Sequence, residues 1–126
     1  MKNISCGDFH SAVVDEHGSL FVWGSNYYGQ LGIPFFQEKN LPEKVLNLYN
    51  NELKNMKILS AHCGPNYTLI ITRENTLYAT GHNRFNTLNL TANVVNYTQF
   101  EKIKFPNNIG GAACGGKFKK FQCILI

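Results

Sequence analysis

The chain repeats itself at a spacing of 57 residues, and this repeat limits its fold more than any other feature of the sequence. Residues 4–32 align with residues 61–89 without a gap. Six of the 29 pairs are identical: Cys6/Cys63, Gly7/Gly64, Leu20/Leu77, Gly24/Gly81, Asn26/Asn83 and Leu31/Leu88. A third, weaker copy begins at Ala112, where the loop after its Cys-Gly pair is three residues longer. A period of this length is typical of arrays in which one supersecondary unit stacks on the next.

Each copy reads as short strands separated by turns. Residues 10–15 and 19–23 are predicted strands in the first copy, and residues 67–72 and 76–80 are their counterparts in the second. Two further strand candidates, residues 41–48 and 56–62, complete a four-stranded middle unit. A short helix over residues 46–57 is the alternative, but the many Asn residues and the lack of a clear cap favour loop and strand. Four antiparallel strands that recur at this spacing predict a propeller blade.

Three glycines of the first copy stand opposite asparagines in the second: Gly18/Asn75, Gly29/Asn86 and Gly32/Asn89. After glycine, asparagine is among the residues that best tolerate a positive φ. The exchanges therefore predict three left-handed turn positions, and they argue against a phosphate cradle, in which an Asn side chain would block the ligand. On this reasoning, replacing Gly29 by Asn should cost little.

The residue order of the first copy resembles the regulator of chromosome condensation repeat. The pattern runs Cys-Gly-x-x-His-Ser, then a turn glycine, then WGSNYYGQLG over residues 23–32. The second copy departs from it, with Tyr67 in place of the His and Thr80 in place of the Trp. The resemblance implies these structural repeat-signature residues: Cys6, Gly7, His10, Gly18, Trp23, Gly24, Asn26, Gly29, Gln30, Leu31, Gly32, Cys63, Gly64, Gly81, Asn83, Leu88, Cys114 and Gly115.

The resemblance implies an all-β fold and a seven-bladed β-propeller, of which 126 residues supply only a part. We expect a partial β-propeller of about two and a half four-stranded antiparallel blades. The repeat units are approximately residues 1–50, 51–99 and 100–126, the last one truncated, with three, four and three strands. Such a segment leaves an apolar blade face and open strand edges at its ends. It would be a piece of a longer protein, a fragment that assembles, or a decayed copy.

The function expected from this fold is a protein-protein interaction scaffold, with no catalytic activity of its own. The alternative, carried by the resemblance, is a guanine-nucleotide exchange factor for a Ran-like small GTPase. We expect no catalytic, cofactor-binding or metal-binding residues, because no residue of the exchange face can be matched and fold alone does not fix function. The expected partners are other proteins, including a small GTPase, and the rest of a propeller or further copies of the chain.

Charge and hydropathy indicate which partners and which cellular location to expect. The net charge of +4 is spread along the chain, which makes nucleic-acid binding unfavoured. The N-terminal residues lack the apolar core of a signal peptide, and no apolar run is long enough to span a membrane. We therefore expect a protein of the cytoplasm or nucleus, with reduced cysteines.

The sequence gives weaker support to three other kinds of site: a phosphate-binding loop, a zinc site and a Cys-His nucleophile pair. Residues 111–117 fit G-x-x-x-x-G-K, but Phe118 stands where a phosphate-binding loop needs Ser or Thr, and the segment after it reads as a strand. The candidate zinc ligands lack the spacing of a compact zinc site; they are Cys6, His10, His62, Cys63, Cys114 and Cys123. A Cys6–His10 nucleophile pair is explained by the repeat signature. The signature cysteines are expected to be small buried residues before a turn glycine.

Overall fold

A computed structural model describes residues 3–33, 37–45, 56–83 and 95–103, together with the backbone of residues 112–114 and 123–125. All regular elements in this part of the chain are β-strands, arranged in three antiparallel sheets. The expected all-β fold is therefore confirmed. Within these residues, no helix is long and apolar enough to cross a membrane.

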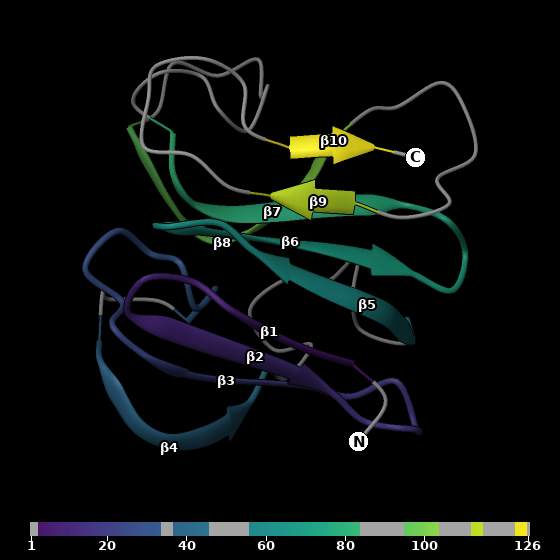
Figure 1. Cartoon of the computed structure of the whole chain (residues 1–126), viewed down its shortest axis with the longest axis horizontal. Coiled ribbons are helices and arrows are strands. Elements are labelled where there is room, and N and C mark those ends of the chain that lie inside the picture. The colour runs from purple at the N-terminus through teal and green to yellow at the C-terminus, as the bar shows by residue number, and fades with distance from the viewer. Residues whose placement is uncertain are drawn as a thin grey trace.

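The first sheet has the order β1-β2-β3-β4 and forms the first blade (Figure 1). Its strands are β1 (Asn3–Cys6), β2 (His10–Val14), β3 (Leu20–Gly24) and β4 (Lys39–Lys44). The β2–β3 hairpin is in register from His10 opposite Gly24 to Val14 opposite Leu20. The pairing of β3 with β4 is interrupted by an irregularity between Val22 and Gly24.

The second sheet repeats this order as β5-β6-β7-β8 and forms the second blade. Its strands are β5 (Ile58–Cys63), β6 (Tyr67–Thr72), β7 (Leu77–His82) and β8 (Asn96–Ile103). The third sheet pairs β9 (Ala112–Cys114) with β10 (Cys123–Leu125). In Figure 1 the three sheets lie one above another, and contacts run from β1 to β5 and from β5 to β9.

One strand belongs to a different sheet from the one that the sequence indicated. The segment predicted over residues 41–48 was grouped with residues 56–62, but the observed strand, β4, pairs with β3 in the first blade. The reason is that the loop after Gly24 reverses the chain, so the next strand adds antiparallel to the edge of the hairpin that it has just left. The first blade thus has four strands instead of three. Most of the segment with the helix alternative lies outside the described residues.

The two blades pack face to face, and side chains alternate along each strand accordingly. In β2, His10, Ala12 and Val14 are buried toward the second blade, whereas Ser11 and Val13 are half-buried on the opposite face. The core between the blades is one cluster: Ala12, Val14, Leu20, Val22, Leu31, Ile33, Ile58, Ala61, Cys63, Ile70, Tyr78 and Phe100. A second cluster fills the other face of the second blade: Tyr67, Leu69, Ile71, Leu77, Ala79 and Ile103.

The turns confirm the argument from glycine and asparagine. Gly18 has a φ of 80° and its counterpart Asn75 has a φ of 66°, so both close their hairpins in the left-handed region. Gly29 and Gly32 are left-handed as well, with φ of 83° and 69°. Their counterparts Asn86 and Asn89 lie outside the described residues.

Candidate functional site: the interface between the blades

The signature loop of residues 25–33 holds itself together with side-chain hydrogen bonds. The Asn26 side chain accepts a bond from the Leu31 amide at 3.0 Å and donates one to the Ile33 carbonyl at 2.8 Å. The Gln30 side chain accepts a bond from the Tyr28 amide at 2.9 Å. A loop with buried backbone needs such partners, because an unpaired buried amide is costly. Leu31 is fully buried, so the expectation that it anchors the loop is confirmed.

A polar chain crosses from the first blade to the second through Thr68. The Thr68 hydroxyl donates to the Gln30 carbonyl at 2.6 Å, and His10 Nε2 lies 2.8 Å from the same hydroxyl oxygen. Because the Thr68 hydrogen is used toward Gln30, Nε2 of His10 must be the donor in the second bond. The expectation that His10 hydrogen-bonds between strands or blades is therefore confirmed.

His10 is neutral in this position. Burial lowers its pKa to about 4, against smaller raising effects from the Tyr67 carbonyl and from Asp8. Its Nδ1 is buried and has no hydrogen-bond partner in the described part of the chain. A proton on that nitrogen would have no acceptor, so the charged ring does not fit between the blades.

Two glycines of the loop let the second blade come close. A Cβ on Gly29 would overlap the Tyr97 carbonyl, and one on Gly32 would overlap the Phe100 ring. The Thr80 hydroxyl lies 2.8 Å from the carbonyl oxygens of both Gly29 and Tyr97 and can donate to either. The expectation that Asn would be tolerated at Gly29 is therefore wrong, because the position must be both left-handed and free of a side chain. The correct part of that expectation was the backbone conformation.

Side chains of β1 also cap the free edge of β5. The Asn3 side chain accepts a hydrogen bond from the Ala61 amide at 2.8 Å, and the Ser5 hydroxyl accepts one from the Cys63 amide at 2.9 Å. The Cys63 thiol in turn donates to the Ser5 carbonyl at 3.5 Å. Burial raises the pKa of Cys63 to about 11, which keeps it a thiol. An edge strand is thus satisfied by the neighbouring blade without strand pairing.

One face of the first blade is exposed, whereas the corresponding face of the second blade is covered. Ile4 is 54% exposed, whereas its counterpart Ala61 is fully buried. Cys6 is exposed and Cys63 is buried, so the prediction of a buried cysteine holds for Cys63 and is wrong for Cys6. The physical reason is that no described blade packs in front of β1. We call the residues of this surface the open face: Ile4, Cys6, Ser11, Val13, Phe21 and Trp23.

Trp23 lies on this open face and not between the blades. It pairs with Ser11 across the hairpin, on the side opposite to His10, and it is only half-buried. The face that carries Trp23 has no described blade in front of it, so the expectation that Trp23 packs blade against blade stays a prediction. Its counterpart Thr80 is the residue that meets the neighbouring loop.

The predicted signature residues reach the interface unequally. Those whose side chain or backbone meets the second blade, or shapes the loop that does, are His10, Gly18, Asn26, Gly29, Gln30, Leu31 and Gly32. Gly7 and Gly64 pack against the rings of His10 and Tyr67, and Gly24 and Gly81 take positive φ beside the preceding turn. Asn83 is buried, and its backbone amide donates a hydrogen bond to the Val95 carbonyl. Cys114 ends β9, and Leu88 and Gly115 lie outside the described residues.

Sequence reasoning missed the receiving side of the interface. The hydroxyls of Thr68 and Thr80 donate hydrogen bonds to backbone carbonyls of the first blade. The side chains of Asn3 and Ser5 accept hydrogen bonds from backbone amides of β5. The alignment of Ser11 with Thr68, a hydroxyl kept in both copies, was the signal that could have identified one of them. No group of three or more His, Cys, Asp or Glu side chains that could hold a metal occurs among the described residues.

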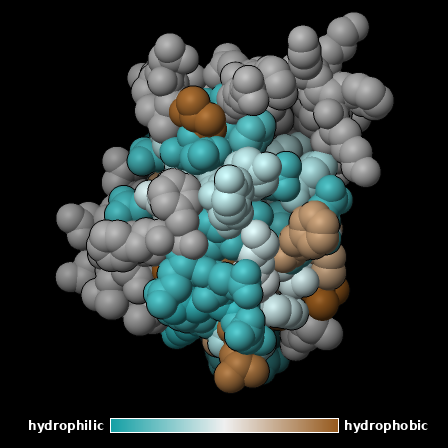
Figure 2. Space-filling model, turned by 90° about the vertical axis from the view of Figure 1, so that its left-hand side faces the viewer, coloured by the Kyte–Doolittle hydropathy of each residue, from teal (hydrophilic) through white to brown (hydrophobic). Residues whose placement is uncertain are grey.

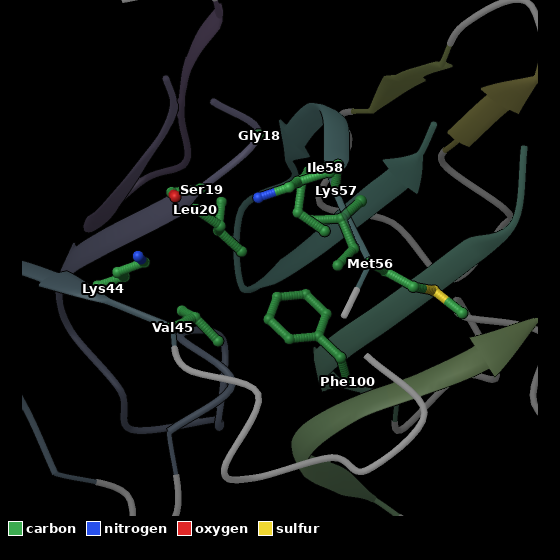
Figure 3. Close-up of a pocket in the computed structure, with 10 residues that line it drawn as sticks. Gly18, Ser19, Leu20, Lys44, Val45, Met56, Lys57, Ile58 and Phe100 are labelled. Carbon is green, nitrogen blue, oxygen red and sulfur yellow. The ribbon is translucent and has the colours of Figure 1, made fainter. Parts of the chain in front are cut away.

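A small cavity of about 90 Å³ opens at the other end of the interface, near the Gly18 turn (Figure 3). Its floor is apolar, with Leu20, Ile58 and Phe100 pointing inward, and Lys44 and Lys57 stand at its border. Nothing in this lining resembles a catalytic group. It is a packing gap between two curved sheets.

Comparison with known proteins supports a repeat architecture. Two family models described as Regulator of chromosome condensation (RCC1) repeat match residues 1–30 and residues 17–71. The human X-linked retinitis pigmentosa GTPase regulator is 41% identical over 88 residues, which are 70% of this chain and 8% of that protein. The serine/threonine-protein kinase Nek9 of Xenopus laevis is 33% identical over 112 residues, which are 86% of this chain and 11% of that protein.

Solved structures show the same fold. Prp20p of Saccharomyces cerevisiae, solved in a study of its binding to Gsp1p and histones, superposes with a TM-score of 0.75 at 21% identity. The match covers 95% of this chain and 29% of that structure. The chain therefore spans about a tenth of the length of the two relatives above and less than a third of a solved propeller.

Proposed function

The chain belongs to the regulator of chromosome condensation repeat family, and from this premise we propose that it is a protein-interaction scaffold. It would act as a propeller segment, with repeat units at approximately residues 1–50, 51–99 and 100–126. It would work in the cytoplasm or nucleus, with other proteins as partners. The alternative function is regulation of a Ran-like GTPase. Two similar proteins support this alternative: the relative named as a GTPase regulator, and Prp20p, whose binding to Gsp1p was studied.

The observation that carries this proposal is the use made of the signature residues. The His10 side chain and the Gln30 carbonyl are hydrogen-bonded to Thr68 of the next blade. The Gly29 carbonyl is hydrogen-bonded to Thr80 of the same blade. The residues that could have suggested chemistry are thus committed to structure. Relatives such as the kinase Nek9 are enzymes by name, but the match covers only 11% of that protein.

Nucleotide exchange separates the two functions. A Ran-type GTPase loaded with fluorescent GDP is mixed with the purified chain, and the release rate is followed with and without it. A scaffold leaves the rate unchanged. A tenfold or greater acceleration, saturable in the concentration of the chain, would establish the alternative.

Absolute mass in solution tests the propeller segment itself. Because the open face lacks the cover that the second blade has, we expect the chain to associate beyond its monomer mass of 14.2 kDa. Val13→Asp places a charge on the open face, where the counterpart Ile70 is fully buried, and it should shift the chain toward monomer. The matched control is Leu41→Asp, on the outer strand β4, where Leu41 is 77% exposed. A stable, fully folded monomer for the parent chain would refute the need for a further blade.

A further inference from the structure

Two aromatic side chains of the first blade stand in solvent at the end where the signature loop lies. Phe9, in the turn before β2, and Tyr27, in the loop, are each 75% exposed. Figure 2 views the molecule from this side, and apolar residues appear there as separate patches among hydrophilic ones. A scaffold surface usually places its binding energy in a few such aromatic residues.

The backbone at Phe9 is held in place, and the Tyr27 ring is supported by neighbouring rings. The Phe9 carbonyl accepts a hydrogen bond from the Ser25 amide at 2.8 Å, and Gly24 packs directly against it. The Tyr27 ring meets Tyr28 edge-on at 4.9 Å, and Tyr28 meets His82 of the second blade in the same way at 4.9 Å. Tyr27 therefore ends a chain of edge-on ring contacts that joins both blades, and it loses little freedom when a ligand binds.

The repeat does not require these aromatics. Phe9 corresponds to Asn66 and Tyr27 to Arg84 in the second copy, so neither position needs an aromatic ring to build a blade. At this degree of exposure the rings also contribute little to the core. Their presence is left without a folding explanation.

The charge of the first blade is opposite to that of the chain. Residues 3–33 contain three acids and neither Lys nor Arg. Asp15 and Glu16 lie in the β2–β3 turn at the far end of the hairpin, so Asp8 is the acid of residues 3–33 at the Phe9 end. Lys39, opposite Gly24, is paired with Glu43 at 2.9 Å. Asp8, exposed between Gly7 and Phe9, puts a negative charge beside the first aromatic. An aromatic face next to a carboxylate is a setting that attracts a cation.

We infer that Phe9, Tyr27 and Asp8 form a contact surface for an arginine-rich segment of a partner protein. A guanidinium stacks on an exposed ring and pairs with a carboxylate, and it does so better than an ammonium because it is planar and weakly hydrated. This inference rests on the proposed scaffold function, for which it names the class of partner. An acidic or a purely apolar partner fits the surface less well, since the first lacks charge complementarity and the rings form no continuous groove.

The test uses a fluorescein-labelled peptide of alternating arginine and glycine, with lysine–glycine and glutamine–glycine peptides of equal length. Anisotropy titrations with the full chain are run at low and at high salt. We expect the arginine peptide to bind most tightly and to retain binding at high salt, where simple charge attraction is screened. The glutamine peptide should not bind.

Variants decide which residues are responsible. Phe9→Ala combined with Tyr27→Ala should weaken arginine-peptide binding about tenfold, and Asp8→Asn should reduce the preference for charged peptides. Leu41→Ala is the control, because Leu41 is equally exposed but lies on β4. Circular dichroism checks that each variant keeps its strands.

Three outcomes would overturn the inference. Equal binding of the arginine and lysine peptides, unaffected by the double variant, would mean charge attraction alone, and so would complete loss at high salt. Absence of binding to all three peptides would also refute it. None of these outcomes affects the mass measurement on the open face, so the inference can fail while the proposed function stands.

Discussion

Acid should loosen the interface between the blades through His10. The ring is 3% exposed, its Nε2 donates to Thr68, and its Nδ1 has no partner among the described residues. Burial lowers the pKa of His10 from 6.5 to about 4 in the folded chain. Below pH 6.5 the unfolded chain binds a proton that the folded chain refuses until about pH 4. Stability is therefore greatest above pH 6.5 and falls as the pH falls toward 4.

The magnitude follows from the shift. A pKa difference of about 2.5 units corresponds to about 3 kcal/mol, lost between pH 6.5 and pH 4 and constant below that. Since a small domain has about 5–15 kcal/mol of stability in all, the loss is large enough to measure. His62 adds to it, because burial also lowers the pKa of that side chain.

The assay is urea unfolding of the parent chain and of His10→Gln, at equal protein concentration and at several pH values from 7.5 to 4. Glutamine keeps a side-chain donor for Thr68 but does not titrate, so it isolates the proton of His10. We expect the parent to lose about 3 kcal/mol more than the variant across this range. Parallel pH dependences for the two chains would refute the neutral, buried His10 and the donor assignment drawn from it.

Further substitutions test single contacts, each by thermal or urea unfolding. Thr68→Val should cost about 2–3 kcal/mol because it leaves two buried partners unpaired, whereas Thr68→Ser, which keeps the hydroxyl, should cost less than half of that. Gly24→Val should unfold or aggregate the chain, because φ is 105° and a Cβ would overlap the Phe9 carbonyl; a parent-like melting temperature would disprove the turn assignment. Gly29→Asn should be several times more costly than Gly18→Asn, because a Cβ at Gly29 would overlap the backbone carbonyl of Tyr97, whereas one at Gly18 would meet the Lys57 side chain at 2.8 Å. Equal costs would mean that left-handed conformation alone selects these glycines.

Local conformation was readable from the sequence, and contacts between blades were not. Gly18 and Asn75 occupy the same position in the two copies, and both residue types tolerate a positive φ. The alignment therefore predicted the left-handed turn directly. The requirement at Gly29 comes from Tyr97, which is 68 residues away in the chain and outside any local window. The predicted sheet of β4 was wrong for a related reason. A long loop precedes this strand, and local sequence does not indicate which hairpin the strand pairs with. The site was therefore half predicted: the donor His10 was identified, and its acceptor Thr68 was not.

The departures of the second copy from the signature fit its surroundings, which argues against decay. Thr80 stands where the first copy has Trp23; it is fully buried, and its hydroxyl lies 2.8 Å from the Gly29 carbonyl oxygen. Tyr67 replaces the signature His and is buried, and its ring packs against Gly64 as the His10 ring packs against Gly7. A copy that had merely accumulated substitutions would leave voids or unpaired polar groups at these positions. Each blade instead carries the residues that its particular neighbour requires, so the two copies are distinct parts of one assembly and are not interchangeable.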